Sequence, residues 1–160
     1  MRDKRSFYIA LTLATFAFAA TLGCGGPKKP DGLPSLVPCR ATVTQSGVPL
    51  EGATVRLVPI EGDGRWAVAG VTDAKGVVEF LTHGQFKGAP VGKYSVVVSK
   101  EISETENKKV KMFTVVEKKF TQQTTTDLTL EVADKGADAT FDLGDPVKDF
   151  LEEFDEATDP

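Results

Sequence analysis

Histidine is almost absent from this chain: its 160 residues contain one, His83. A zinc site usually draws on several imidazole or thiolate ligands, so an isolated histidine makes a poor metal site. Hydrolysis needs a nucleophile with an oriented base beside it, and the residues around His83 supply no such arrangement. We therefore expect no catalytic residue, no metal and no cofactor, and we expect His83 to lie in a surface loop.

Cysteine is also scarce, with Cys24 and Cys39 the only two in the chain. Exported proteins normally pair their cysteines, but a lone cysteine on a strand is most often a small buried hydrophobe. We expect Cys39 to be buried in this way, with a reactive thiol as the alternative. Asp63 and Asp73 lie in glycine-containing segments where calcium could bind, but no series of oxygen ligands follows either one. Both are expected to form turns.

The chain also lacks an excess of positive charge. Its formal net charge is −4, and residues 144–160 alone hold seven acids and one lysine. Binding to nucleic acid requires a basic surface. We therefore expect no nucleic-acid partner.

The first 24 residues combine a basic start, an apolar run and a cysteine. Residues 7–22 carry no charge, and as a helix they would span about 24 Å, less than the roughly 30 Å hydrocarbon core of a membrane. This pattern is typical of an export signal. The sequence Gly23-Cys24 resembles the end of the lipobox of bacterial lipoproteins, although Thr21 and Leu22 differ from its usual form. The resemblance implies that Cys24 is acylated and becomes the first mature residue.

The alternatives are an uncleaved anchor helix and an ordinary signal peptide with an incidental cysteine. The preferred division is a lipoprotein signal peptide at 1–23 and a flexible tether at 24–36. Three prolines and three glycines within residues 25–36 leave that stretch unable to form a core. The predicted location is the bacterial cell envelope, periplasmic or surface-exposed, with the membrane bound through a lipid anchor.

Residues 37–143 carry the repeated pattern of half-buried strands. After the turn at Gly47 and Pro49, apolar residues alternate with polar ones, as in a strand with one buried face. Between these strands, within residues 37–143, no segment has helical periodicity. Seven short strands separated by turns predict an all-β fold of the β-sandwich type; the expected segments are 37–44, 53–59, 66–71, 76–81, 92–100, 127–133 and 139–143.

Three motifs in this region occur in a recognisable order, namely Gly-Val-Pro-Leu-Glu-Gly-Ala-Thr-Val from Gly47, Gly-Val-Thr-Asp-Ala-Lys-Gly from Gly70, and Pro-Val-Gly-Lys-Tyr-Ser-Val-Val-Val from Pro90. Together they resemble the carboxypeptidase regulatory-like domain, which is a transthyretin-like domain. The resemblance implies a seven-stranded Greek-key sandwich over 37–143 and a non-catalytic role. The chain departs from that pattern at Cys39 and in a long insertion at 101–125.

These features together predict a non-catalytic, lipid-anchored envelope protein that acts as a binding or structural module. Recognition usually lies in loops on a rigid scaffold, here residues 61–65, 81–90 and the insertion. The partner would be an envelope protein or a polysaccharide. The alternative is a carbohydrate-binding or small hydrolase-like protein of the transthyretin superfamily. Trp66 could stack on a sugar, although a tryptophan on a strand is more often part of the core.

The acidic tail, residues 144–160, shows a helical pattern. Asp145 and Pro146 form a cap followed by proline at the first helical position, and apolar residues recur at helical spacing up to Phe154. The lysine-rich insertion at 101–125 has the opposite charge. We expect a short helix that docks near this insertion, with a frayed tail or a helix that serves a partner protein as the alternatives.

Overall fold

The computed structural model describes residues 28–62 and 64–155. The chain divides into a unit of residues 1–30 and a unit of residues 31–160, and the fold below is that of the second unit. The expected signal peptide (1–23), Cys24, the first part of the tether and Asp63 lie outside the described residues. Within the described ranges, no helix is long and apolar enough to cross a membrane.

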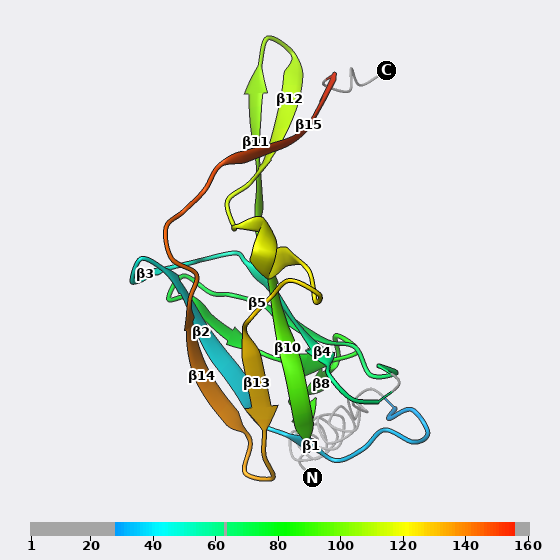
Figure 1. The fold of residues 1–160 in the computed structure, drawn as a ribbon. Helices are drawn as coiled ribbons and strands as arrows, with labels where there is room; N and C mark the ends of the chain where they lie inside the picture. Colours follow the sequence, from blue (N-terminus) through cyan, green and yellow to red (C-terminus); the bar gives the residue numbers. More distant parts are fainter. Residues whose placement is uncertain (1–27, 63, 156–160) are drawn as a thin grey trace, which may run out of the picture. The chain divides into compact units, whose positions relative to one another are not determined.

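Two sheets form the body of the second unit (Figure 1). The first is wholly antiparallel and contains, in spatial order, β13 (Thr129–Val132), β10 (Gly92–Ser99), β4 (Thr54–Pro59), β5 (Val68–Val71), β7 (Leu81–Thr82) and β8 (Phe86–Lys87). The second contains β14 (Ala137–Asp142), β2 (Cys39–Gln45) and β3 (Val48–Pro49), with β6 (Val77–Glu79) also paired to β2. A small pair, β1 (Leu36–Val37) with β9 (Ala89–Pro90), completes this body.

The alternation seen in the sequence places the core between these two sheets. Ala41 and Val43 of β2 are fully buried, as are Val55 of β4 and Val96 of β10. Residues from both sheets belong to one hydrophobic cluster, as in a β-sandwich. Fully burying a side chain of this kind contributes about 1.5–3 kcal/mol, so the shared core is what holds the two sheets together.

The expected all-β class is confirmed, and each of the seven segments predicted as strands overlaps a strand. One pairing has no counterpart in the prediction. The strands β14 and β2 are parallel, with Ala137 opposite Cys39 and Asp142 opposite Thr44. The first long strand of the body therefore lies beside its last, where Arg40 forms an exposed ion pair of 2.6 Å with Asp138.

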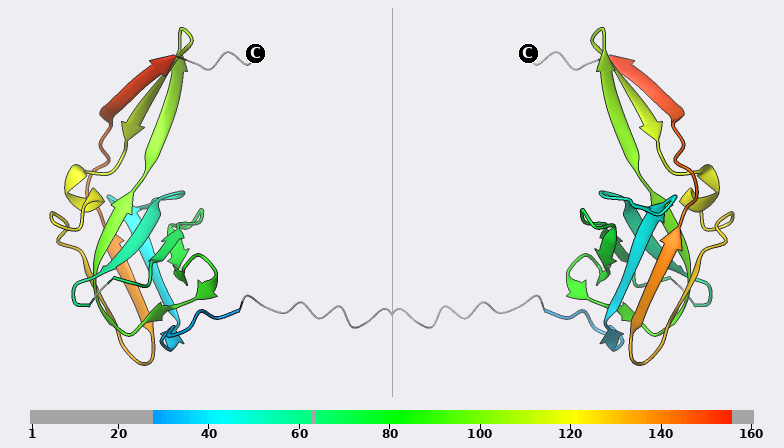
Figure 2. Two further views of the ribbon diagram at one scale, coloured as in Figure 1. Left: turned by 90° about the vertical axis from the view of Figure 1, so that its right-hand side faces the viewer. Right: turned by 90° about the vertical axis from the view of Figure 1, so that its left-hand side faces the viewer.

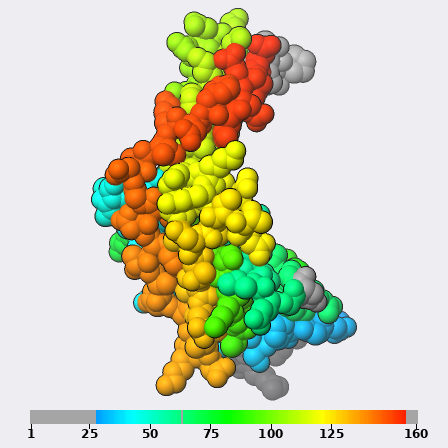
Figure 3. Space-filling view, in the orientation of Figure 1, coloured from blue at the N-terminus to red at the C-terminus, as the bar shows by residue number. Residues whose placement is uncertain are grey.

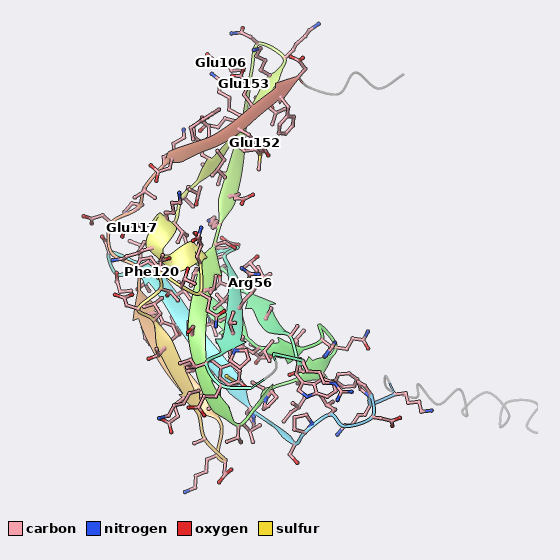
Figure 4. All side chains as sticks on the ribbon, turned by 45° about the vertical axis from the view of Figure 1, so that its right-hand side comes forward. Arg56, Glu106, Glu117, Phe120, Glu152 and Glu153 are labelled. Carbon is pink, nitrogen blue, oxygen red and sulfur yellow. The ribbon has the colours of Figure 1, made fainter. Side chains whose placement is uncertain are left out.

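A third sheet of three strands extends from the body (Figures 1 and 2). Its order is β11 (Glu101–Glu106), β12 (Lys109–Thr114) and β15 (Asp149–Asp155), all antiparallel. Between β12 and β13 the chain forms the 3-10 turn η1 (Lys118–Thr121), which buries Phe120 in the core (Figure 4). The region expected to be an insertion thus contains a hairpin and a turn.

The prediction of a helical tail is wrong. Residues 149–155 form strand β15, which pairs with β12 of the insertion, so the expected docking near the insertion occurs but as a strand. The carboxylate of Asp145, the expected helix cap, accepts a hydrogen bond of 2.6 Å from the Ser46 hydroxyl instead. An eleven-residue helix is marginal alone in water, whereas the free edge of β12 offers a full set of backbone partners.

Candidate binding surface

The environments of Cys39 and His83 differ. Cys39 is free and buried, as expected, and burial raises the pKa of its thiol to about 11. His83 is exposed in the turn after β7, in agreement with the expected surface position, and its φ of 52° lies in the left-handed region. A thiol that is protonated and enclosed at neutral pH is a poor nucleophile.

Trp66 is not a core residue, contrary to the more common role of a strand tryptophan. It precedes β5 and is half-buried. Its ring meets that of His83 edge to face, with centroids 5.2 Å apart, and the Arg65 guanidinium carbon lies 4.9 Å from the ring centroid. These three side chains form a small aromatic and cationic site, which we call the Trp66 corner. It brings together two of the predicted recognition loops, 61–65 and 81–90.

The aspartate turn behaves as predicted. One carboxylate oxygen of Asp73 accepts hydrogen bonds from the backbone N–H groups of Lys75 and Val77, at 2.8 and 2.9 Å. At the end of the same turn, Gly76 has a φ of 73°, and a Cβ atom there would collide with the carbonyl oxygen of Val43. Among the described residues, no group of three or more histidine, cysteine or acidic side chains could hold a metal ion.

Aromatic and ionic contacts between side chains stabilise the three-stranded sheet. The ring of Phe113 lies between Ile102 and Phe150 in the strand register and meets Phe150 edge to face, with centroids 6.0 Å apart. The Lys148 ammonium group lies 4.5 Å from the Phe113 ring centroid and 2.6 Å from a Glu104 oxygen. These contacts connect the tail to both strands of the hairpin.

Two further ion pairs lie across the same sheet, near the hairpin tip (Figure 4). Lys109 donates to Glu153 at 2.6 Å, and Lys111 donates to Glu106 at 2.8 Å. These hydrogen bonds lower the pKa of both glutamates and raise the pKa of both lysines. Because all four side chains contact solvent, each pair stabilises the sheet only slightly.

Strand β15 is the most exposed part of this sheet. All seven of its residues are exposed, and Figure 3 shows the strand at the surface of the molecule. Three of them are large and apolar: Phe150 is 58% exposed, Leu151 46% and Phe154 48%. Phe150 lies opposite Phe113 and Phe154 opposite Val110, so the two rings leave exposed apolar area on both faces of the sheet. Exposed apolar area of this kind marks a candidate interaction site. We call β15 with these three side chains the β15 edge.

The sequence contained a signal for the hairpin that the prediction did not use. Asn107 and Lys108 form its two-residue turn, both with positive φ, and asparagine tolerates that conformation better than most residues. The stretch after it, Lys109–Thr114, alternates lysine with apolar residues. Strand β11 is polar except for Ile102, so it lacks the apolar alternation that would have identified it as a strand.

A pocket of about 680 Å³ lies beside β1, at the end of the body away from the three-stranded sheet. Its lining includes charged residues of both signs, Arg40, Glu79, Lys87, Lys135 and Asp138. Since Arg40 and Asp138 neutralise one another, the pocket presents no strong charge preference.

No family model, no curated protein and no solved structure matches this chain. The candidate surfaces are therefore defined by their own geometry: the β15 edge first, because of its exposed apolar area, and the Trp66 corner second.

Proposed function

We propose that the chain is a non-catalytic, lipid-anchored protein of the bacterial cell envelope whose β-sandwich acts as a binding or structural module. The observation that best supports a role as a binding module is the position of the β15 edge. Strand β1, where the chain enters the body, lies at the end opposite the three-stranded sheet (Figure 1). A protein held through Cys24 would present the β15 edge away from its point of entry.

We also infer that residues 37–143 form a seven-stranded Greek-key sandwich of the carboxypeptidase regulatory-like type. The motifs that begin at Gly47, Gly70 and Pro90 support this. So does the path of the chain, which passes from β2 in one sheet to β4 in the other, and from β13 back to β14. The β11–β12 hairpin and β15 would then be additions to that domain.

Membrane fractionation of a Cys24→Ser chain tests the anchor. The substitution removes the acylated sulfur, so the protein should move from the membrane into the soluble fraction. The matched control is Cys39→Ala, which alters the other cysteine and should leave the protein in the membrane fraction. If the Cys24→Ser chain stayed in the membrane with an unprocessed amino terminus, an anchor helix would replace the lipid.

The Trp66 corner favours a second candidate, the binding of an envelope polysaccharide. A half-exposed indole flanked by Arg65 and His83 offers an apolar face for a sugar ring and polar groups for its hydroxyls. Trp66 is the only tryptophan, so its fluorescence reports on that site directly. Purified cell-wall polysaccharide should shift the emission of the wild-type chain, and a Gln85→Ala control at the same turn should respond alike. An unchanged emission spectrum would remove this candidate.

An assay of substrate hydrolysis tests the proposal that the protein is not an enzyme. The purified chain should leave ester, glycoside and ureide substrates unchanged. Sustained hydrolysis that is lost in a His83→Gln variant would overturn the assignment and favour the small hydrolase-like alternative.

A further inference from the structure

The β15 edge has one open side. Strand β15 is the last strand of the sheet β11-β12-β15, and among the described residues only β12 pairs with it. A strand at the edge of a sheet presents unpaired N–H and C=O groups, which form a template for another strand. Natural proteins often block such edges with lysine or proline, and β15 contains neither.

The charges of the sheet alternate from strand to strand. The sequence of β15, Asp-Phe-Leu-Glu-Glu-Phe-Asp, has four acids and no base. The central strand β12 carries Lys109 and Lys111, whereas β11 at the opposite edge carries three glutamates. Only Glu153 of the β15 acids forms an ion pair among the described residues, so Asp149, Glu152 and Asp155 remain available for a partner.

This arrangement disfavours a second copy of the chain at the open side. Two β15 strands side by side would bring eight acids together, and β15 beside β11 of another copy would also place acid next to acid. Like charges directly opposite across a strand pair are destabilising. The strand that fits must therefore bring positive charge.

We propose that the open edge of β15 binds an extended segment of a partner protein in which lysine or arginine alternates with apolar residues. The backbone of that segment adds a fourth strand to the sheet. Its basic side chains lie on the face of Asp149 and Glu152, and its apolar side chains lie on the opposite face, beside Phe150. This inference rests on the proposed role as a binding module, and it names the partner's chemistry.

The chain itself supplies the pattern for such a partner. Strand β12, Lys-Val-Lys-Met-Phe-Thr, already pairs with the other side of β15 and places Lys111 opposite Glu153 and Val110 opposite Phe154. A synthetic peptide with the sequence of residues 108–115 is therefore the natural probe. A peptide with its three lysines replaced by glutamates is the matched control.

The test is a titration of the full-length chain with the fluorescently labelled probe, followed by fluorescence anisotropy. The wild-type chain should bind the basic peptide, more weakly as salt increases, and should not bind the acidic one. Glu152→Lys should weaken binding on the order of five-fold, because one favourable charge contact becomes repulsive. Glu131→Lys makes the same change on β13, an edge of another sheet, and should bind like the wild type.

Hydrogen exchange gives the second readout. Strand addition predicts that amides of β15 gain protection while those of β12 keep theirs. The proposal is contradicted if the basic peptide does not bind, if both lysine variants lose affinity equally, or if β12 loses protection because the peptide displaces it. A chain that dimerises through β15 without any peptide would also contradict it. None of these results bears on the anchor, since the Cys24→Ser fractionation tests that separately.

Discussion

Phe113 near the base of the hairpin and Phe150 in the last strand meet edge to face, with ring centroids 6.0 Å apart. They are 37 residues apart in the sequence and directly opposite in the sheet. Edge-to-face aromatic pairs contribute about 0.5–1.5 kcal/mol beyond the area they bury. An exposed ion pair contributes only about 0–1 kcal/mol, so we expect the ring contact to contribute at least as much as either ion pair that joins the tail to the hairpin.

Phe150→Ala should therefore loosen the three-stranded sheet without unfolding the body. A loss of about 1 kcal/mol from this ring pair predicts that the amides of β12 exchange with solvent roughly five-fold faster. Ile60→Ala, which also shortens an exposed apolar side chain but lies outside that sheet, should leave β12 unchanged. Equal exchange rates in all three chains would show that the ring contact does not hold the tail.

Asp142 should make stability depend on pH. Its carboxylate accepts hydrogen bonds from the N–H groups of Gly47 and Gly144 at 2.7 and 2.8 Å, and from the Thr44 hydroxyl at 2.9 Å. These bonds hold the pKa of the Asp142 carboxyl below its usual range. The charged form is thus favoured in the folded state, so the stabilisation is present at neutral pH and is lost as the pH falls through the lowered pKa.

Urea unfolding at several pH values would measure this effect. Asp142→Asn should be less stable than the wild type near neutral pH, and the difference should shrink under acidic conditions. Glu131→Gln, which also neutralises an exposed acid but one with no hydrogen bond among the described residues, is the control. A difference between Asp142→Asn and the wild type that stayed constant with pH would contradict the assignment.

Cys39 should resist thiol reagents in the folded protein. With a pKa of about 11, only roughly one thiol in ten thousand is ionised at neutral pH, and burial blocks access as well. In the Cys24→Ser chain, which has Cys39 as its sole cysteine, modification should be slow in buffer and fast in urea. Rapid modification in buffer would identify Cys39 as a reactive thiol.

The body of the fold was predictable because its strands follow the simplest pattern, apolar residues at every second position. Val55 and Leu57 face inward and Arg56 outward, as period-two alternation requires. The parallel neighbours β2 and β14 were not predictable, since their pairing depends on contacts between residues 98 apart, such as Cys39 and Ala137. Local patterns carry no information on such distant partners.

The prediction for the tail, residues 144–160, was wrong for a different reason. Phe150, Leu151 and Phe154 have helical spacing, but Leu151 is an extra residue in the strand register, where Met112 opposes Glu152 and Phe113 opposes Phe150. A β-bulge of this kind breaks the alternation that identifies a strand. The candidate surface was therefore found in part: the insertion and the tail were expected to meet, but their sheet and its open edge were visible only in the structure.

The central proposal is that Cys24 carries a lipid and that this lipid holds the module in the envelope. Mass spectrometry of the amino-terminal peptide from membrane-extracted protein tests it most directly. The account predicts a chain that begins at Cys24, with added mass corresponding to about two or more acyl chains, since one chain alone anchors only marginally. A peptide that begins at Met1, or an unmodified Cys24, would contradict it.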